Sequence, residues 1–235
     1  MAFAILFLVI SLPSVGEAEE LNSSFDSGTD GWIGAGGILT YETSGGNPGG
    51  FIEMEDNQGT FMTVVSPVQF SGNLSEFLYG EISFDAINVN GAPPNLVTGT
   101  FGTVTIVGAS ATSSKVLGGF DQPIADATWR TYFSTLEASE WEGDLAAALA
   151  NVVSISVELE SNADVPAETN GFDNFRICRP ILGDLNCDGV INLLDVEPFV
   201  NAVTNGNFVF KADINGDGAV NLLDVSPFVN LLSGG

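Results

Sequence analysis

Short hydrophobic runs, separated by polar and turn-forming residues, recur along the middle of the chain. The runs are rich in β-branched or aromatic residues, and Gly, Asn, Pro and Ser separate them. Runs of this kind, bounded by turn residues, are typical of β-strands. We expect strands at residues 61–65, 81–84, 103–107, 132–134 and 152–159. Their spacing predicts a β-sandwich.

Helical patterns appear after this region and once within it. Residues 145–150 (LAAALA) are strong helix formers, and Asp144 is a candidate N-cap. Towards the C-terminus, the apolar pattern L-L-D-V-x-P-F-V-N occurs twice at helical spacing. Pro198 and Pro227 lie where a continuous helix would lose a backbone hydrogen bond, so we expect each helix to restart or kink there.

These two helical patterns belong to a duplicated acidic segment. Residues 184–203 and 213–232 are offset by 29 residues and identical at 13 of 20 positions. Each copy reads D-x-N-x-D-G-x-x-N-x-x-D, which places side-chain oxygens at loop positions 1, 3, 5, 9 and 12 and glycine at position 6. This is the spacing of calcium-binding loops, except that position 12 is Asp rather than the usual Glu.

The repeat therefore predicts two calcium ions, one in each loop. The predicted ligands are Asp184, Asn186, Asp188, Val190, Asn192 and Asp195 in the first loop, and Asp213, Asn215, Asp217, Ala219, Asn221 and Asp224 in the second. Val190 and Ala219 would contribute main-chain carbonyl oxygens, and Asn192 or Asn221 could act through water. The alternative is a pair of Asx-rich turns, since Asp, Asn and Gly favour turns without any metal. The matching register of the two copies favours calcium.

The sequences flanking the loops distinguish an EF-hand, which needs a helix before and after its loop, from a loop that is followed by a helix but not preceded by one. Residues 179–183 and 205–212 are too short, and too broken by Pro and Gly, to form helices that enter the loops. A duplicated loop followed only by an exiting helix resembles the type I dockerin domain, over residues 181–235. The resemblance implies two loop–helix units that pack antiparallel around calcium and dock on a cohesin domain of another protein.

In many dockerins the residues at loop positions 10 and 11 help to select the cohesin. By this resemblance the partner-binding residues are Leu193, Leu194, Leu222 and Leu223. These positions are often polar in the family, so the leucines depart from its pattern. A self-contained pair of units, or one closed on the rest of this chain, stays open as an alternative.

The N-terminal residues predict export. Residues 2–12 form an apolar run that is too short to span a bilayer, and small residues follow it up to position 18. We interpret residues 1–18 as a secretory signal peptide, although a basic n-region is missing; a buried strand is the alternative. No later run has the roughly 18 apolar residues of a transmembrane segment.

Charge and cysteine content agree with this setting. Thirty acidic residues against five basic ones, with no histidine, give a net charge of −25, which disfavours nucleic acid and anionic membranes as partners. Cys178 and Cys187 are nine residues apart and could form a disulfide in an oxidising compartment, with two free thiols as the alternative. Cys187 occupies loop position 4, which is not a ligand position.

Residues 19–180 form the other predicted domain. The segments SPVQFSG, YGEISF, WRTY and GFDNF, at residues 66–72, 79–84, 129–132 and 171–175, resemble in their order a laminin B domain, also called laminin IV type A. The resemblance implies a jelly-roll sandwich like those of many carbohydrate-binding modules, with no catalytic residue. Trp32, Trp129 and Trp141 could stack on sugar rings, although aromatic residues at strand ends more often lie in the core.

Catalysis has little support in the sequence. Without histidine there is no Ser–His–Asp or Cys–His arrangement, whereas glycoside hydrolysis needs only two carboxylates. We expect a mainly β protein, with a jelly-roll β-sandwich followed by a small all-α calcium-binding dockerin-like domain. It would be a secreted, non-catalytic adaptor that joins a cohesin-type partner to matrix, surface or polysaccharide. The alternatives are a small glycoside hydrolase or accessory subunit in polysaccharide breakdown, and a calcium-stiffened structural surface protein.

Overall fold

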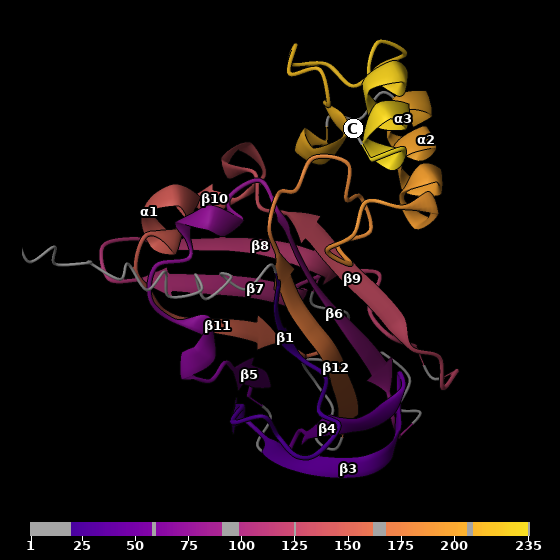
Figure 1. Cartoon of the computed structure of the whole chain (residues 1–235). Helices are drawn as coiled ribbons and strands as arrows, with labels where there is room; N and C mark the ends of the chain where they lie inside the picture. The colour runs from indigo at the N-terminus through magenta and orange to yellow at the C-terminus, as the bar shows by residue number, and fades with distance from the viewer. Residues whose placement is uncertain are drawn as a thin grey trace, which may run out of the picture.

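The computed structural model describes residues 20–57, 60–90, 99–124, 126–161, 168–205 and 209–234. The predicted signal peptide at residues 1–18 lies outside them. Two β-sheets form the body of the molecule, and a small helical unit lies beyond one end of it (Figure 1). We call the two parts the sandwich and the C-terminal unit, which begins at residue 181.

The first sheet carries the last strand of the sandwich near its centre. Its order is β3-β4-β12-β6-β9, all antiparallel, and β1 pairs with the C-terminal half of β12. The strands are β1 (Glu20–Ser23), β3 (Ile38–Gly46), β4 (Gly49–Glu55), β6 (Glu81–Asn88), β9 (Arg130–Thr135) and β12 (Thr169–Cys178). Because β12 ends at Cys178, the sheet leads directly into the C-terminal unit.

The second sheet packs against the first. Its order is β10-β8-β7-β11-β5-β2, again antiparallel. The strands are β2 (Ile33–Ala35), β5 (Thr63–Val65), β7 (Phe101–Gly108), β8 (Thr112–Gly119), β10 (Glu142–Gly143) and β11 (Val152–Glu158). The short helices η1 (Val68–Phe70), η2 (Ser75–Phe77) and η3 (Ala138–Glu140) lie in the connections between the sheets, and α1 (Leu145–Leu149) joins β10 to β11 within the second sheet.

An aromatic cluster fills the space between the sheets. Trp32 packs against Phe172 and Phe175, with ring centroids 5.2 and 4.8 Å away, and its indole Nε1 donates to Ser23 Oγ at 2.9 Å. Trp141 is also buried in this core. Burial of both rings excludes them as sugar-stacking surfaces, and of the three tryptophans only Trp129 is partly exposed.

The predicted fold class is confirmed. Each of the five expected strand segments overlaps one strand: β5, β6, β7, β9 and β11. The expected helix is α1, and the Asp144 carboxylate caps it by accepting a hydrogen bond from the Ala147 backbone N–H at 3.0 Å. The β3–β4 hairpin was not predicted.

The C-terminal unit contains two α-helices and two single turns of 3₁₀-helix. These are η4 (Leu193–Asp195), α2 (Val196–Asn205), η5 (Phe210–Ala212) and α3 (Val225–Leu232). The rings of Phe199 and Phe228 stack between the α-helices with centroids 4.0 Å apart. In the described residues no α-helix enters either loop, and η5 leads directly into the second.

The prediction of a restart or kink at the two prolines needs correction. Pro198 and Pro227 are each the third residue of an α-helix, so both lie in the first turn. The backbone N–H groups of a first turn have no partner within the helix, and proline therefore costs no hydrogen bond there. None of the helices in the described residues is long and apolar enough to cross a membrane.

Candidate functional site

The aspartate at position 1 closes each loop of the repeat. Asp184 accepts hydrogen bonds from the backbone N–H groups of Asp188 and Gly189, at 3.1 and 3.0 Å. In the second loop, Asp213 accepts from the equivalent groups at positions 5 and 6, at 3.1 and 2.9 Å. Gly189 has φ of 79°, which a residue with a Cβ resists. The conserved Asp–Gly spacing within the repeat thus produces the same curl twice.

The aspartate at position 12 holds the other side of each loop. Both Asp195 and Asp224 are 0% exposed. Asp195 accepts from the N–H groups of Leu185, Asn186 and Asn192 at 2.7, 3.1 and 2.8 Å. Asp224 accepts from Asn215 and Asn221, at 3.1 and 2.9 Å. These buried carboxylates are therefore fixed by the backbone of their own loops.

Positions 3, 5 and 9 are more exposed and form a third matching set. The Asn186 amide donates to Asp188 Oδ2 at 2.8 Å, and the Asn215 amide donates to Asp217 Oδ2 at 3.1 Å. Hydrogen bonds from the Asn186 side chain and the Val190 backbone hold the pKa of Asp188 below its ordinary value. Both loops thus keep a carboxylate or an amide oxygen at each expected side-chain ligand position.

The donor set fits a hard divalent cation. Each loop offers carboxylate, amide and carbonyl oxygens and no nitrogen or sulfur ligand, which is the chemistry that calcium prefers. Burial raises the pKa of Asp184, against backbone hydrogen bonds and the charge of Lys211, so a nearby cation would favour its charged form. Across the described residues no three His, Cys, Asp or Glu side chains by themselves make a metal cluster. A calcium site here would need the asparagine and carbonyl oxygens as well.

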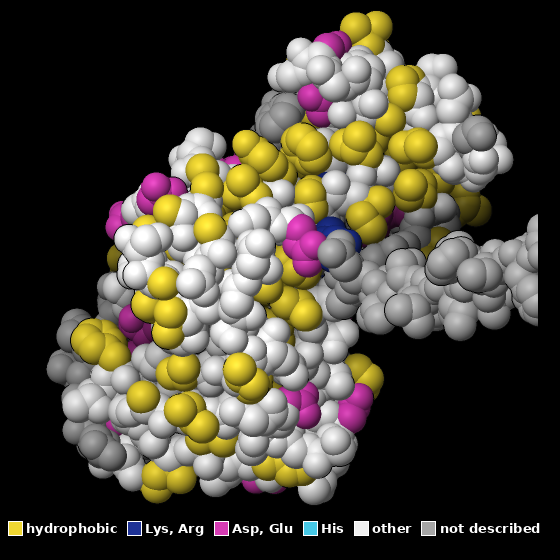
Figure 2. Space-filling view, turned by 60° about the vertical axis from the view of Figure 1, so that its left-hand side comes forward, with side chains coloured by type: hydrophobic (Ala, Val, Ile, Leu, Met, Phe, Trp, Pro, Cys, Tyr) yellow, Lys and Arg dark blue, Asp and Glu magenta, His cyan; other side chains and the backbone are white. Residues whose placement is uncertain are grey.

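The four leucines predicted to bind a partner are on the surface. Leu193, Leu194, Leu222 and Leu223 are 80%, 66%, 79% and 66% exposed. Between α2 and α3 lies an apolar groove of about 330 Å³, lined by residues that include Val200, Leu222 and Val229. Hydrophobic side chains are spread over the C-terminal unit and its junction with the sandwich (Figure 2). The leucines were predictable from the sequence, whereas the groove between the helices was not.

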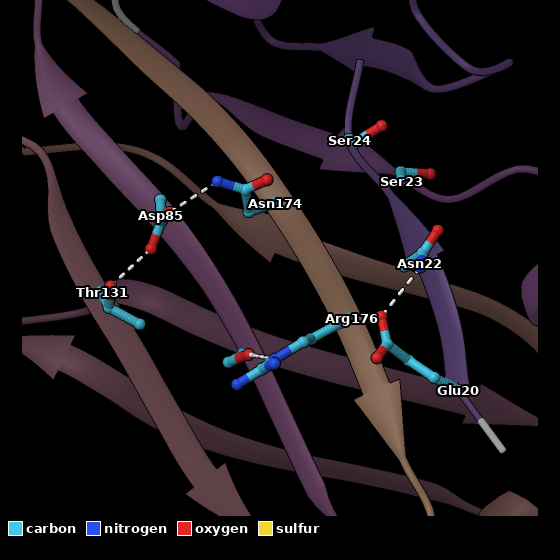
Figure 3. Close-up of a pocket in the computed structure, with 9 residues that line it drawn as sticks. Glu20, Asn22, Ser23, Ser24, Asp85, Thr131, Asn174 and Arg176 are labelled. Carbon is cyan, nitrogen blue, oxygen red and sulfur yellow. Dashed lines mark hydrogen bonds between the residues drawn. The ribbon is translucent and has the colours of Figure 1, made fainter. Parts of the chain in front are cut away.

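The sandwich carries a second hollow, which the sequence did not reveal. It is a polar groove of about 330 Å³ on the outer face of the first sheet. Its lining comes from β1, β6, β9 and β12 and includes Asn22, Ser83, Asp85, Thr131, Asn174 and Arg176 (Figure 3). We call it the polar groove.

Hydrogen bonds order the side chains of the polar groove. The Asp85 carboxylate accepts from Thr131 Oγ1 at 2.6 Å, Asn174 Nδ2 at 2.8 Å and Asn47 Nδ2 at 3.0 Å. The Arg176 Nε donates to Ser83 Oγ at 3.0 Å. Asp85 therefore anchors neighbouring donors at the base of the groove, which presents hydroxyl, amide and guanidinium groups.

Next to Asp85 on the neighbouring strand lies a fully buried carboxyl, Asp173. Burial raises its pKa to about 6, and the charges of Asp85 and Asp26 add to this rise. Backbone N–H groups of Asn47 and Asn174, at 2.6 and 2.8 Å from its oxygens, act in the opposite direction. Asp173 therefore titrates near neutral pH.

The last residue of β12 is joined to the first loop. Cys178 and Cys187 form a disulfide, with their Cα atoms 5.9 Å apart. Cys187 contributes no oxygen to the loop's ligand set. The covalent connection therefore leaves every predicted ligand position of the first loop available.

The C-terminal unit has the architecture of a duplicated loop–helix module. Residues 182–233 match the family model of the dockerin type I domain. Domains of this family bind calcium. The match covers the C-terminal unit and leaves the sandwich without a family assignment. No curated protein matches the chain.

Solved structures relate to the sandwich through its fold. An exo-beta-agarase shares 16% identity over 69% of this chain, with a TM-score of 0.52, and the match spans 25% of the agarase. A family 11 carbohydrate-binding module from Clostridium thermocellum shares 15% identity over 68% of this chain and 95% of its own, with a TM-score of 0.44. The L4b domain of human laminin alpha-2 shares 10% over 51% of this chain and 71% of its own, with a TM-score of 0.40. The laminin likeness is too loose to carry a family assignment.

Proposed function

We propose that this protein is a secreted, non-catalytic adaptor whose C-terminal unit docks on a cohesin-type partner in the presence of calcium. Its sandwich would hold a polysaccharide. The observation that carries the proposal is the hydrogen-bond frame repeated in the two loops, from Asp184 to Asp195 and from Asp213 to Asp224. Two calcium ions would bind, one in each loop.

The exposed leucines support docking through the C-terminal unit. Four large apolar side chains in water are costly unless a partner covers them, because burying apolar surface contributes about 25 cal/mol per Å². They lie directly before the two helices, at loop positions 10 and 11. Calcium would fix the loop ends and so present both pairs of leucines in a defined geometry.

The polar groove supports a neutral glycan as the ligand of the sandwich. Hydroxyl and amide groups such as Thr131, Ser83 and Asn22 can exchange hydrogen bonds with sugar hydroxyls. Asp85 and Glu20 place negative charge in the groove, and the chain carries a net charge of −25, so an acidic polysaccharide would be repelled. Export is supported by the predicted signal peptide and by the disulfide.

Docking can be tested by retention on immobilised cohesin domains in calcium and in chelator. We expect calcium-dependent retention that the double variant Leu193→Asp/Leu222→Asp abolishes. Val153→Asp is the matched control, because Val153 is an exposed apolar residue of β11 in the sandwich. Retention in chelator, or retention of the leucine variant, would contradict docking. Calcium binding with no retention on a broad cohesin panel would favour the calcium-stiffened structural alternative.

Glycan binding can be tested by mobility in gels that contain neutral or acidic polysaccharides. We expect a neutral polysaccharide to retard the wild type and Thr131→Val to relieve the retardation, with Val153→Asp unchanged. An unchanged Thr131→Val would exclude the polar groove as the site. Release of soluble sugar from the same polysaccharides would support the hydrolase alternative and overturn the non-catalytic proposal.

A further inference from the structure

Position 4 is where the two loops differ most in backbone chemistry. It is Cys187 in the first loop and Gly216 in the second. Both residues have left-handed backbone conformations, with φ of 59° and 71°. Glycine adopts this conformation without steric cost, whereas a residue with a Cβ does so only when its surroundings hold it there. The loop geometry therefore requires Cys187 to hold a left-handed backbone conformation that Gly216 adopts without steric cost.

The disulfide supplies that restraint. It ties Cys187 to Cys178, the last residue of β12, and both cysteines are buried. Since β12 is hydrogen-bonded on both sides at its C-terminal end, by β1 and β6, the anchor point is part of the rigid sheet. The first loop is thus fixed at position 4 to a strand of the sandwich.

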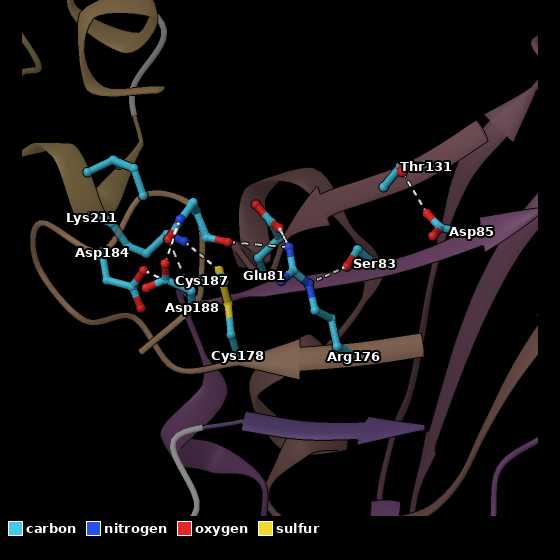
Figure 4. A network of polar contacts seen from close by, with 12 residues as sticks. Glu81, Ser83, Asp85, Thr131, Arg176, Cys178, Asp184, Cys187, Asp188 and Lys211 are labelled. Atoms are coloured by element: carbon cyan, nitrogen blue, oxygen red, sulfur yellow. Dashed lines mark hydrogen bonds and ion pairs between the residues drawn. A yellow bond between two sulfur atoms is a disulfide. The ribbon is translucent and has the colours of Figure 1, made fainter. Parts of the chain in front are cut away.

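Further contacts at the same place reinforce the connection (Figure 4). The Lys211 ammonium, which is almost fully buried, donates to Cys187 Sγ at 2.7 Å, and its backbone carbonyl accepts from Gly183 N–H at 2.9 Å. An Arg176 Nη2 of the sandwich donates to the Asn186 carbonyl at 3.4 Å. By contrast, the described side-chain hydrogen bonds of the second loop stay within residues 213–224.

We infer that the Cys178–Cys187 disulfide is a positioning device for calcium in the first loop alone, so that its oxidation state sets the affinity of that loop and leaves the second unchanged. This inference rests on the proposed calcium function. In the oxidised protein Cys187 is held in the left-handed conformation before calcium arrives. In the reduced protein the loop must reach that conformation as calcium binds, and the cost is subtracted from the binding free energy.

The redox step itself is simple. An external dithiol, such as dithiothreitol, delivers two electrons and two protons. The sulfur–sulfur bond breaks, Cys178 and Cys187 become thiols, and the dithiol leaves as its own disulfide. Neither sulfur is a calcium ligand, so the reduction changes how the loop is held while the ligand set stays the same.

The test uses one loop at a time. Asp213→Ala leaves the first loop to titrate, and Asp184→Ala leaves the second. In each background, calcium calorimetry compares the oxidised chain with Cys178→Ser/Cys187→Ser, and with Cys178→Ser/Cys187→Gly, which has the residue type of the second loop. We expect the serine pair to weaken the first loop about tenfold, or about 1.4 kcal/mol. The glycine variant should recover most of this loss, and the second loop should change less than about twofold.

The possible results separate the inference from the proposed function. An unchanged first loop in the serine variant, equal weakening of both loops, or a glycine variant as weak as the serine variant would each overturn the inference. Absence of calcium binding in the oxidised wild type would instead overturn the proposed function. Near-ultraviolet circular dichroism of each variant without calcium checks the packing of the sandwich core, and the glycine variant keeps the test decisive if the serine variant is poorly folded.

Discussion

The two loops share a sequence and a hydrogen-bond frame but have different surroundings. Asp184 and Asp213 hold the same two backbone N–H groups, at nearly the same distances. Only the first loop is tied covalently to the sandwich, and only the first has described hydrogen bonds to Lys211 and Arg176. The repeat therefore determines the shape of each loop, while tertiary contacts determine how firmly each is held.

This difference also explains how the two domains are joined. A C-terminal unit on a flexible linker would move independently of the sandwich. Here the stacked rings of Tyr79 and Phe210, with centroids 5.1 Å apart, add to the disulfide at the junction. The first loop is thus part of the domain interface, and the second belongs to the C-terminal unit alone.

The largest expected difference between the two loops comes from removing the aspartate at position 12 of each. Asp195→Ala would remove the side-chain acceptor of three backbone N–H groups, and Asp224→Ala would remove that of two. We expect losses of about 4 and about 3 kcal/mol in the free energy of unfolding, together with loss of calcium binding in the altered loop. Urea unfolding followed by fluorescence measures both losses in the free energy of unfolding. A larger loss for Asp224→Ala would contradict the assignment of the first loop as the more firmly held.

Lys211 provides the next test, because its charge acts on the first loop. Its buried ammonium lies near the carboxylates of Glu81 and Asp184. In Lys211→Met both carboxylates lose this cation, although Glu81 keeps its ion pair with Arg176 at 3.7 Å, and we expect about 3 kcal/mol of destabilisation in chelator. Adding Glu81→Gln should recover about half of it. Lys115→Met, at a partly exposed ion pair with Glu140, is the control and should cost less than about 1 kcal/mol. Equal losses of stability for the two lysine variants would contradict a role of Lys211 in stabilising the junction between the sandwich and the first loop.

Asp173 separates the acid response of the sandwich from that of the loops. Because burial raises its pKa from 3.8 to about 6, the folded protein binds a proton more tightly than the unfolded chain. Its contribution to stability is therefore fully present below about pH 4 and is lost as the pH rises through 6, by up to about 3 kcal/mol. Asp173→Asn should remove this decline in urea unfolding curves from pH 4 to 7. Calcium affinities of both loops at pH 7 should be unchanged, and a shift in either would mean that the regions are coupled through the first sheet.

The smallest expected effect belongs to the ring stack at the junction. A double-mutant cycle of Tyr79→Leu and Phe210→Leu should give a coupling of about 1 kcal/mol in thermal unfolding. The same cycle on Phe199 and Phe228, which stack within the C-terminal unit, provides the reference. Zero coupling between Tyr79 and Phe210 would mean that the disulfide stabilises the junction without a contribution from the ring stack.

Local patterns in the sequence were sufficient for much of the fold. The β-branched runs and the cap at Asp144 are each read within about ten residues, which is the range over which turn and helix chemistry acts, and the repeat is found by comparing two segments 29 residues apart. The β3–β4 hairpin was missed because β3 is largely exposed and polar, so it lacks the apolar alternation of a strand with one buried face. The aromatic residues of the core likewise gave no local sign of which would be buried.

The non-local parts of the candidate site could not be predicted. The polar groove joins β1, β6, β9 and β12, and Asp85 meets Asn174 across 89 positions of sequence. Lys211 precedes the second loop by two residues, yet its side chain reaches the first. Such contacts depend on strand order and on domain packing. The hydrogen-bond frame of each loop, in contrast, was within reach of the sequence because each loop contains its own aspartates and asparagines.

Calorimetric titration of the oxidised, chelator-stripped protein with calcium tests the central claim most directly. The account predicts two sites in the wild type, one in each of Asp184→Ala and Asp213→Ala, and none in the double variant. Absence of binding in the wild type, or two sites remaining in the double variant, would contradict the assignment of the repeat as a pair of calcium loops.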